Sequence, residues 1–204
     1  MLDISAAVAE SDAPKLTVTS WRTANVFFSL RVPAELVDAL VDLQGTCSDR
    51  VEPQQRDHIH ITLGFLHDAD AGRLADAAAM LSGRTWPTPT VALTGEVRHG
   101  SWKLSKDPAY RYDEDVIQRQ EQVRLGVGHT PELAEIQTGI TRGLGIEEDG
   151  FWPHVTLGLA RQDFPTAEAK GMTLPSIKGP APSVDLQQEM SVTEFRVLVR
   201  RELS

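Results

Sequence analysis

The sequence contains one short motif twice, and its residues are suited to acid–base chemistry. His-x-Thr-Leu-Gly begins at His60 and again at His154, which places Thr62 and Thr156 two positions after the histidines. Imidazole titrates near neutral pH, so one histidine can be neutral while the other is protonated. The neutral histidine can take a proton from water, and the protonated one can give a proton to the leaving oxygen of a phosphoryl group. The threonine hydroxyls could donate hydrogen bonds to its non-bridging oxygens.

This chemistry requires the four side chains to share one surface, and the alternation of both segments provides for that. Residues 57–65 and 153–159 alternate between polar and apolar positions. A period of two is typical of a β-strand with one face in the core. Each histidine and its threonine would then lie on the face away from the core. Because the residue types and the phase both repeat, we predict two histidine strands within one small domain.

Two residues beside the motifs are further candidates for substrate contact. His58 has the parity of His60, so it could contact the substrate, join His60 and His154 in binding a divalent ion, or stand at the rim of the site. Trp152 has the parity of His154, so it could stack on a nucleobase or pack at the edge of the groove. The residues alone leave these alternatives open.

The other elements follow from hydrophobic periodicity and from turn residues. The pattern predicts strands over residues 21–32, 90–97, 122–127 and 190–202, and a mostly irregular segment over residues 164–184. Helical spacing predicts helices over residues 34–43, 71–81 and 130–142, which end at Gly45, Gly83 and Gly143. The succession strand, helix, histidine strand occurs in each half of the chain. It predicts two similar lobes that bring the two motifs together across a groove.

Two polar segments lack a periodic pattern. Residues 1–18 are small and acidic, which indicates a flexible N-terminal arm before a single domain over residues 19–204. Residues 98–119 form a long polar excursion, which is either a lid or binding loop or a solvated hairpin extension. Tyr110 and Tyr112 lie in this excursion and are weaker candidates for substrate contact.

Composition excludes several classes of protein. The chain has 204 residues with ordinary apolar (41%) and charged (24%) fractions, which favours a globular domain. A net charge of −9 argues against a protein that grips long nucleic acid by neutralising phosphates. Cys47 is the single cysteine, so an intramolecular disulfide and a cysteine-based zinc site are excluded. No secretory signal or membrane-spanning apolar stretch is visible, so we expect a cytoplasmic protein.

The paired motifs resemble those of the two-histidine (2H) phosphoesterase superfamily. The resemblance is to the branch of the LigT-like bacterial RNA 2′,3′-cyclic phosphodiesterases, also called 2′-5′ RNA ligases. It extends to the strand that ends at Val32-Pro33 and the helix after it, to Phe65-Leu66, and to the aromatic-Pro-His start of the second motif at residues 151–154. The similarity therefore covers roughly residues 21–201.

The resemblance implies a bilobal α+β fold, with two pseudo-symmetric lobes of antiparallel sheet and outer helices around a central groove. It implies that His60 and His154 form the catalytic acid–base pair and that Thr62 and Thr156 bind phosphate. The implied activity is a phosphodiesterase that needs no metal or other cofactor. The expected substrate is a cyclic or 2′-linked nucleotide, either a small nucleotide or an RNA end, and the protein is expected to be a monomer.

The sequence departs from this pattern at one position, and other functions stay open. An arginine that helps to hold phosphate is expected soon after the second motif, but Leu159 stands there and Arg161 lies two residues later. Some branches act on other substrates, including phage enzymes that degrade cyclic oligonucleotide immune signals. A histidine-ligated metal-dependent hydrolase and a nucleotide-binding module without turnover are the alternatives from other classes.

Overall fold

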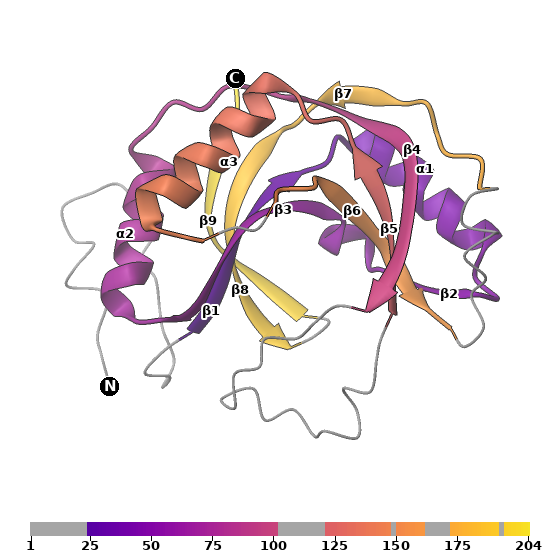
Figure 1. Ribbon diagram of the computed structural model, residues 1–204, viewed down its shortest axis with the longest axis horizontal. Helices are drawn as coiled ribbons and strands as arrows, with labels where there is room; N and C mark the ends of the chain where they lie inside the picture. Colours follow the sequence, from indigo (N-terminus) through magenta and orange to yellow (C-terminus); the bar gives the residue numbers. More distant parts are fainter. Residues whose placement is uncertain (1–23, 102–120, 148–149, 162–171, 192–193) are drawn as a thin grey trace.

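The computed structural model describes residues 24–101, 121–147, 150–161, 172–191 and 194–204, which form a curled sheet with helices on its outside (Figure 1). The strands are β1 (Ala24–Arg31), β2 (Val51–Pro53), β3 (His60–Ala69), β4 (Thr90–Ser101), β5 (Glu121–Val127), β6 (His154–Ala160), β7 (Lys178–Pro180), β8 (Ser183–Ser191) and β9 (Glu194–Glu202). The helices are α1 (Ala34–Thr46), α2 (Ala71–Ser82) and α3 (Pro131–Leu144), and a 3₁₀ turn, η2 (Arg56–His58), precedes β3.

The two motif strands are neighbours in the middle of the sheet. The strand order is β7-β4-β5-β6-β3-β1-β8-β9, all pairs are antiparallel, and β2 pairs with β6 outside this path. On the side of the first motif strand, β3, the sheet continues with β1 and then β8, and on the side of the second, β6, it continues with β5 and then β4. This confirms the predicted α+β fold with two similar antiparallel lobes. The motifs meet side by side, because β3 pairs directly with β6 through Ile61 and Val155.

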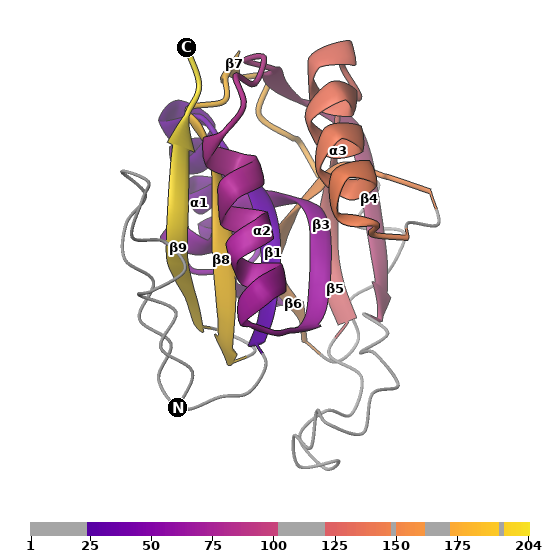
Figure 2. The same cartoon turned by 90° about the vertical axis from the view of Figure 1, so that its left-hand side faces the viewer.

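The helices pack against the sheet from outside. Figure 2 shows α2 and α3 side by side in front of the strands, and the two helices contact each other as well as β3. At the other end α1 packs against β2 and β6, where Gln44 Nε2 donates to the backbone oxygen of Leu157 at 2.7 Å. Within the described part of the chain, no helix combines the length and the apolar character that crossing a membrane requires.

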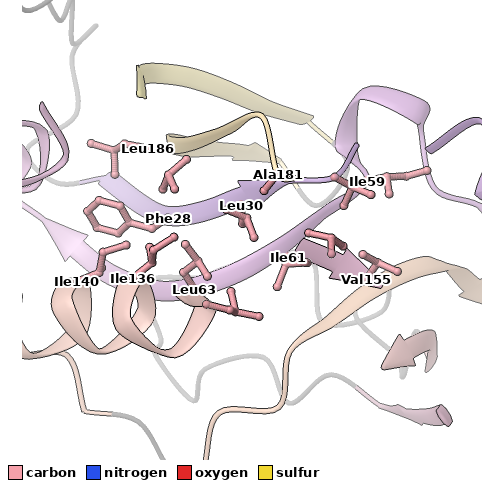
Figure 3. Close-up of a cluster of buried hydrophobic side chains, with 14 of the residues drawn as sticks. Phe28, Leu30, Ile59, Ile61, Leu63, Ile136, Ile140, Val155, Ala181 and Leu186 are labelled. Carbon is pink, nitrogen blue, oxygen red and sulfur yellow. The ribbon is translucent and has the colours of Figure 1, made fainter. Parts of the chain in front are cut away.

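The core fills the space between the helices and one face of the sheet. Figure 3 shows Ile136 and Ile140 of α3 directed toward Phe28 of β1 and Leu63 of β3. These side chains are at most 1% exposed. Each such burial stabilises the fold by about 1.5–3 kcal/mol. The apolar positions of the motif strands are therefore fixed toward the core, which leaves the histidines and threonines on the opposite face.

Two helices continue beyond the glycines at which they were predicted to end. Thr130 caps α3 as expected, since its Oγ1 accepts from the backbone N–H of Leu133. The helix nevertheless continues through Gly143 to Leu144 and is capped by Gly145, which has a left-handed φ of 62°. The end of the Met80 side chain of α2 packs against Gly143 and would have to move to admit a side chain there. Likewise α1 contains Gly45 and ends at Thr46.

The prediction of an irregular segment up to residue 184 was wrong at its end, because β8 begins at Ser183. The polar side chains of β8 are buried, and they hide the pattern of a strand. Asp185 is fully buried, and Arg200 of β9 donates to both of its carboxylate oxygens at 2.8 and 2.9 Å. Strand β4 also runs four residues beyond its predicted end at residue 97. The predicted arm, residues 1–18, lies outside the described residues.

Candidate active site

The pairing of β3 with β6 brings the two motifs into one constellation. Ile61 is the register partner of Val155 in an antiparallel pair, so His60 stands opposite Thr156 and Thr62 stands opposite His154. Ile61 and Val155 are fully buried, while the two histidines and the two threonines are partly exposed on the other face. The four predicted residues are therefore gathered around a local pseudo-twofold axis between the strands.

Both imidazoles are oriented by the same backbone contact. The Nδ1 atom of His60 lies 2.7 Å from the carbonyl oxygen of His58, and Nδ1 of His154 lies 2.9 Å from that of Trp152. A carbonyl oxygen can only accept, so Nδ1 carries the hydrogen in each ring. The lone pair of each neutral ring is then at Nε2. In both motifs Nε2 is the atom available for proton transfer.

The surroundings of His60 are aromatic. Its ring stacks on Phe27 of β1 with 5.1 Å between centroids, and Phe195 of β9 meets it edge-on at 5.8 Å. Nε2 of His60 lies 3.2 Å from Oγ1 of Thr62, whose hydroxyl can donate to it. Burial lowers the pKa of His60 to about 4, and the positive charge of Arg31 acts in the same direction. The neutral imidazole is therefore the stable form of His60 at neutral pH.

The surroundings of His154 are aromatic and charged. Its ring stacks on Trp152 at 4.9 Å with an interplanar angle of 16°, and the guanidinium of Arg98 lies over the same indole at 3.9 Å from its centroid. Glu96 accepts from both Arg98 Nε (2.6 Å) and Trp152 Nε1 (3.1 Å). Burial lowers the pKa of His154, and the charges of Arg124 and Arg98 lower it further.

This arrangement favours packing at the edge of the groove over base stacking, the two roles considered for Trp152. The His154 ring and the Arg98 guanidinium already occupy stacking positions on the indole, so Trp152 supports the histidine rather than presenting an open platform for a base. Gly126 of β5 is the register partner of His154, and its lack of a side chain leaves room for the Trp152 indole. A Cβ at Gly126 would lie 3.3 Å from Trp152 and only 2.7 Å from Oγ1 of Thr94.

Arg124 is a residue of this site that the motif search missed. It is the register partner of Thr156 on β5, so its side chain lies on the same face of the sheet. The guanidinium is about half buried, which lowers its pKa, and Nε donates to Oε1 of Gln122 at 3.2 Å. The sequence alone carried no such signal, because an arginine between Val123 and Leu125 fits the ordinary alternation of a strand with one buried face.

Of the remaining predicted contacts, His58 lies beside the first motif but outside its strand, and Arg161 lies beyond the end of the second motif strand. His58 belongs to the 3₁₀ turn before β3 and not to the strand, and its ring contacts Phe195 at 4.9 Å. Its predicted place on the His60 strand face was therefore wrong. Arg161 follows the end of β6, is exposed, and donates its backbone N–H to the carbonyl of Arg50. Tyr110 and Tyr112 lie outside the described residues.

Among the residues that the structure describes, no group of three or more histidine, cysteine, aspartate or glutamate side chains is placed to hold a metal ion. A cavity of about 710 Å³ lies on the far side of α1, between Leu43, Cys47 and residues 172–175, and does not include the motif residues. The site itself presents imidazoles, hydroxyls and nearby guanidinium groups.

Comparisons with known proteins establish the fold. No family model and no curated protein matches the chain. Among solved structures, E. coli LigT complexed with phosphate aligns with a TM-score of 0.61 at 19% identity, over 90% of this chain and 99% of that one. A phosphoesterase gives 0.63 at 19% identity (89% and 99%), and the protein TT0787 of Thermus thermophilus gives 0.63 at 17% (88% and 97%). The chain has the LigT-like two-histidine phosphoesterase fold.

Proposed function

We propose that this protein is a metal-independent phosphodiesterase that hydrolyses a cyclic or 2′-linked nucleotide phosphodiester by two-histidine acid–base catalysis. The observation that carries the proposal is the pairing of two identical motifs. Two imidazoles with Nε2 available stand beside two threonines on one sheet face, and each ring is oriented by a backbone carbonyl. Acid–base catalysis at phosphorus needs two such groups with opposite protonation.

In this mechanism His60 is the base and His154 is the acid. The neutral His60 accepts a proton at Nε2 from the attacking water as the new P–O bond forms. Protonated His154 gives its Nε2 proton to the leaving ribose oxygen as the old P–O bond breaks. The low pKa of His60 keeps it neutral before the reaction. The positive charges near His154 oppose its protonation in the free protein, but a bound phosphodiester anion offsets them.

The threonines would stabilise the charge that develops on phosphorus. Thr156 stands opposite His60, and Thr62 opposite His154, so a phosphoryl group between the Nε2 atoms would lie within reach of both hydroxyls. Hydroxyl donors aimed at non-bridging oxygens stabilise a transition state more than the ground state, because its negative charge is more concentrated there.

A small nucleotide or an RNA end is the proposed substrate class. E. coli LigT has been crystallised with 3′-AMP and with ATP, so a protein of this fold accommodates mononucleotides. The net charge of −9 disfavours a long polyanion. The scissile groups proposed are the 2′,3′-cyclic phosphate and the 2′-5′ linkage.

A product assay tests this function. The purified chain is incubated with 2′,3′-cyclic mononucleotides, 2′-5′ oligoadenylate, and cyclic di- and trinucleotides, with and without excess EDTA. We expect turnover of a 2′,3′-cyclic or 2′-5′ substrate that chelation leaves unchanged and that His60→Ala and His154→Ala abolish. Turnover of cyclic oligonucleotides alone would move the substrate to that class. Activity lost with EDTA and restored by one metal, or no turnover of any substrate, would refute the proposal.

A further inference from the structure

The geometry points to Arg124 of β5 as the residue that binds the charged oxygen of the scissile phosphate. This inference rests on the proposed function and deepens it. The family resemblance led us to expect a phosphate-binding arginine soon after the second motif, where Leu159 stands and Arg161 lies two residues later. In the structure, Arg124 of the neighbouring strand β5 instead stands opposite Thr156, the threonine that would contact the phosphate.

The first argument is the difference between the two threonines. Thr62 and Thr156 are related by the pseudo-twofold axis, so the residues opposite them on the flanking strands occupy matching positions. Opposite Thr62 on β1 is Ser29, which is fully buried and accepts from Nε2 of Gln187 at 2.6 Å. Opposite Thr156 on β5 is Arg124. The same position is thus a neutral, engaged hydroxyl in one half and a cation in the other.

The second argument is the unfavourable free energy of partly burying the charged Arg124 side chain. The guanidinium is about half buried, and its hydrogen bond is to the neutral amide oxygen of Gln122. Within the described part of the chain no carboxylate forms an ion pair with it, whereas Arg98 and Arg200 each have one. Removing a cation from water without an anionic partner is unfavourable. A bound anion would offset that cost, and a phosphodiester carries one negative charge.

The third argument is the position of the Arg124 side chain and the planar shape of its guanidinium. Arg124 is close enough to His154 for its charge to lower the pKa of that histidine, so it borders the place where the leaving oxygen would be protonated. A planar guanidinium can direct two parallel N–H groups at phosphate oxygens, which a lysine cannot do. The side chain is thus suited to fix the orientation of the phosphate as well as to neutralise it.

Kinetics of three variants test the assignment: Arg124→Gln, Arg124→Lys, and the matched control Arg161→Gln. We expect Arg124→Gln to lower kcat/KM about 10²-fold, the usual scale for one oxyanion donor. Arg124→Lys should recover only part of that loss, and Arg161→Gln should stay within about twofold of wild type. Circular dichroism and thermal unfolding confirm that each variant is folded. Loss in Arg161→Gln with activity retained in Arg124→Gln would overturn the inference.

Sulfur substitution separates contact from a structural effect. The two phosphorothioate diastereomers of the substrate selected by the panel differ only in which non-bridging oxygen is replaced. Wild type should hydrolyse one diastereomer at least about tenfold more slowly, because sulfur is a poorer acceptor for the guanidinium. Arg124→Gln should lose this discrimination, while a merely structural role would lower both rates and leave their ratio unchanged.

A binding measurement keeps the inference testable without turnover. Inorganic phosphate is titrated into wild type and Arg124→Gln, and the His154 ring proton is followed by NMR. We expect the apparent Kd to rise at least about tenfold in the variant, because a charge-assisted hydrogen bond is lost. Equal affinity in both proteins would overturn the inference even if the diesterase activity were established. Conversely, a phosphate contact without diesterase activity would refute only the proposed function.

Discussion

His60 and His154 are oriented by the same backbone contact but lie in different surroundings. Each ring donates Nδ1–H to the carbonyl two residues earlier, and each has a threonine two residues later. Around His60 the neighbours are the phenyl rings of Phe27 and Phe195. Around His154 they are Trp152 and the guanidinium groups of Arg98 and Arg124.

Burial is the largest cause of the lowered pKa at both histidines. Arginine charge adds to it, from Arg31 at His60 and from both Arg124 and Arg98 at His154. At His154 some of the lowering comes from the charges of Arg98 and Arg124, which a bound phosphate would compensate. Substrate binding should therefore favour protonation of His154 over His60. Two identical motifs could in this way acquire the opposite protonation states that acid–base catalysis needs.

The largest effects should come from removing either imidazole. His60→Ala and His154→Ala are each expected to lower turnover by at least about 10²-fold, because a positioned acid or base contributes on that scale. The double variant should lose far less than the product of the two single losses, since the two groups act together. Steady-state kinetics of the three folded variants check this. Near wild-type turnover in either single variant would remove that histidine from the mechanism.

The threonines offer the next largest test. Thr62→Val and Thr156→Val keep the β-branched shape that a strand favours and remove only the hydroxyl. Each should cost about 1.5–3 kcal/mol of transition-state stabilisation, measured as the loss in kcat/KM. Thr62→Val should also change the pH dependence of the rate, because the Thr62 hydroxyl lies 3.2 Å from Nε2 of His60. Unchanged kinetics in both variants would show that neither hydroxyl contacts the phosphate.

A smaller effect is expected at Trp152. Trp152→Phe keeps an aromatic ring under His154 but removes the N–H that Glu96 accepts, and it weakens the contact with Arg98. Cation–π contacts at exposed sites contribute about 0.5–1 kcal/mol, so a loss of roughly two- to fivefold in kcat/KM is expected. Phe27→Leu, which removes the ring that stacks on His60, serves as the comparison variant in the same kinetic assay. If Trp152→Phe left both kcat/KM and the pKa of His154 unaltered, Trp152 would have no positioning role.

The last effect concerns stability and not turnover. The pKa of folded His60 is about 4, below its ordinary value of 6.5, so between these pH values the unfolded chain binds a proton that the folded chain does not. The free energy of unfolding should therefore fall as the pH drops through this window, by at most about 1.4 kcal/mol per pH unit from this group. Urea unfolding of wild type and His60→Gln from pH 7 to 5 measures it. Equal slopes for the two proteins would contradict the low pKa.

Sequence alone was enough to predict the fold class and to single out the four motif residues. The repeated motif singled out the four residues, while the fold class followed from the succession of elements and from the family resemblance. The structure places the four side chains together at the β3–β6 pair. The helices were predicted in kind, and α2 ends at Gly83 as predicted, but α1 and α3 continue past the glycines that were expected to end them. Gly143 lies inside α3, where Met80 fills the space that a side chain would need.

The missed features depend on contacts between distant parts of the chain. The buried polar face of β8 is satisfied by Arg200, which lies 15 residues after Asp185, so hydrophobic alternation could not reveal the strand. Arg124 precedes the second motif by 30 residues and joins it only through the register of β5 with β6. His58 was assigned to the strand by parity, yet the backbone turns at residues 56–58 before β3 begins.

An NMR titration of the two imidazoles tests the central claim most directly. Ring protons of His60 and His154, assigned with the His60→Gln and His154→Gln variants, are followed from pH 3.5 to 8 with and without inorganic phosphate, using protein whose folding is verified at each pH. We predict that free His60 stays neutral down to a pKa of about 4 and that His154 also titrates below 6.5. Phosphate should raise the pKa of His154 by more than that of His60. Identical titrations, or a larger phosphate effect at His60, would contradict the assignment of His60 as base and His154 as acid.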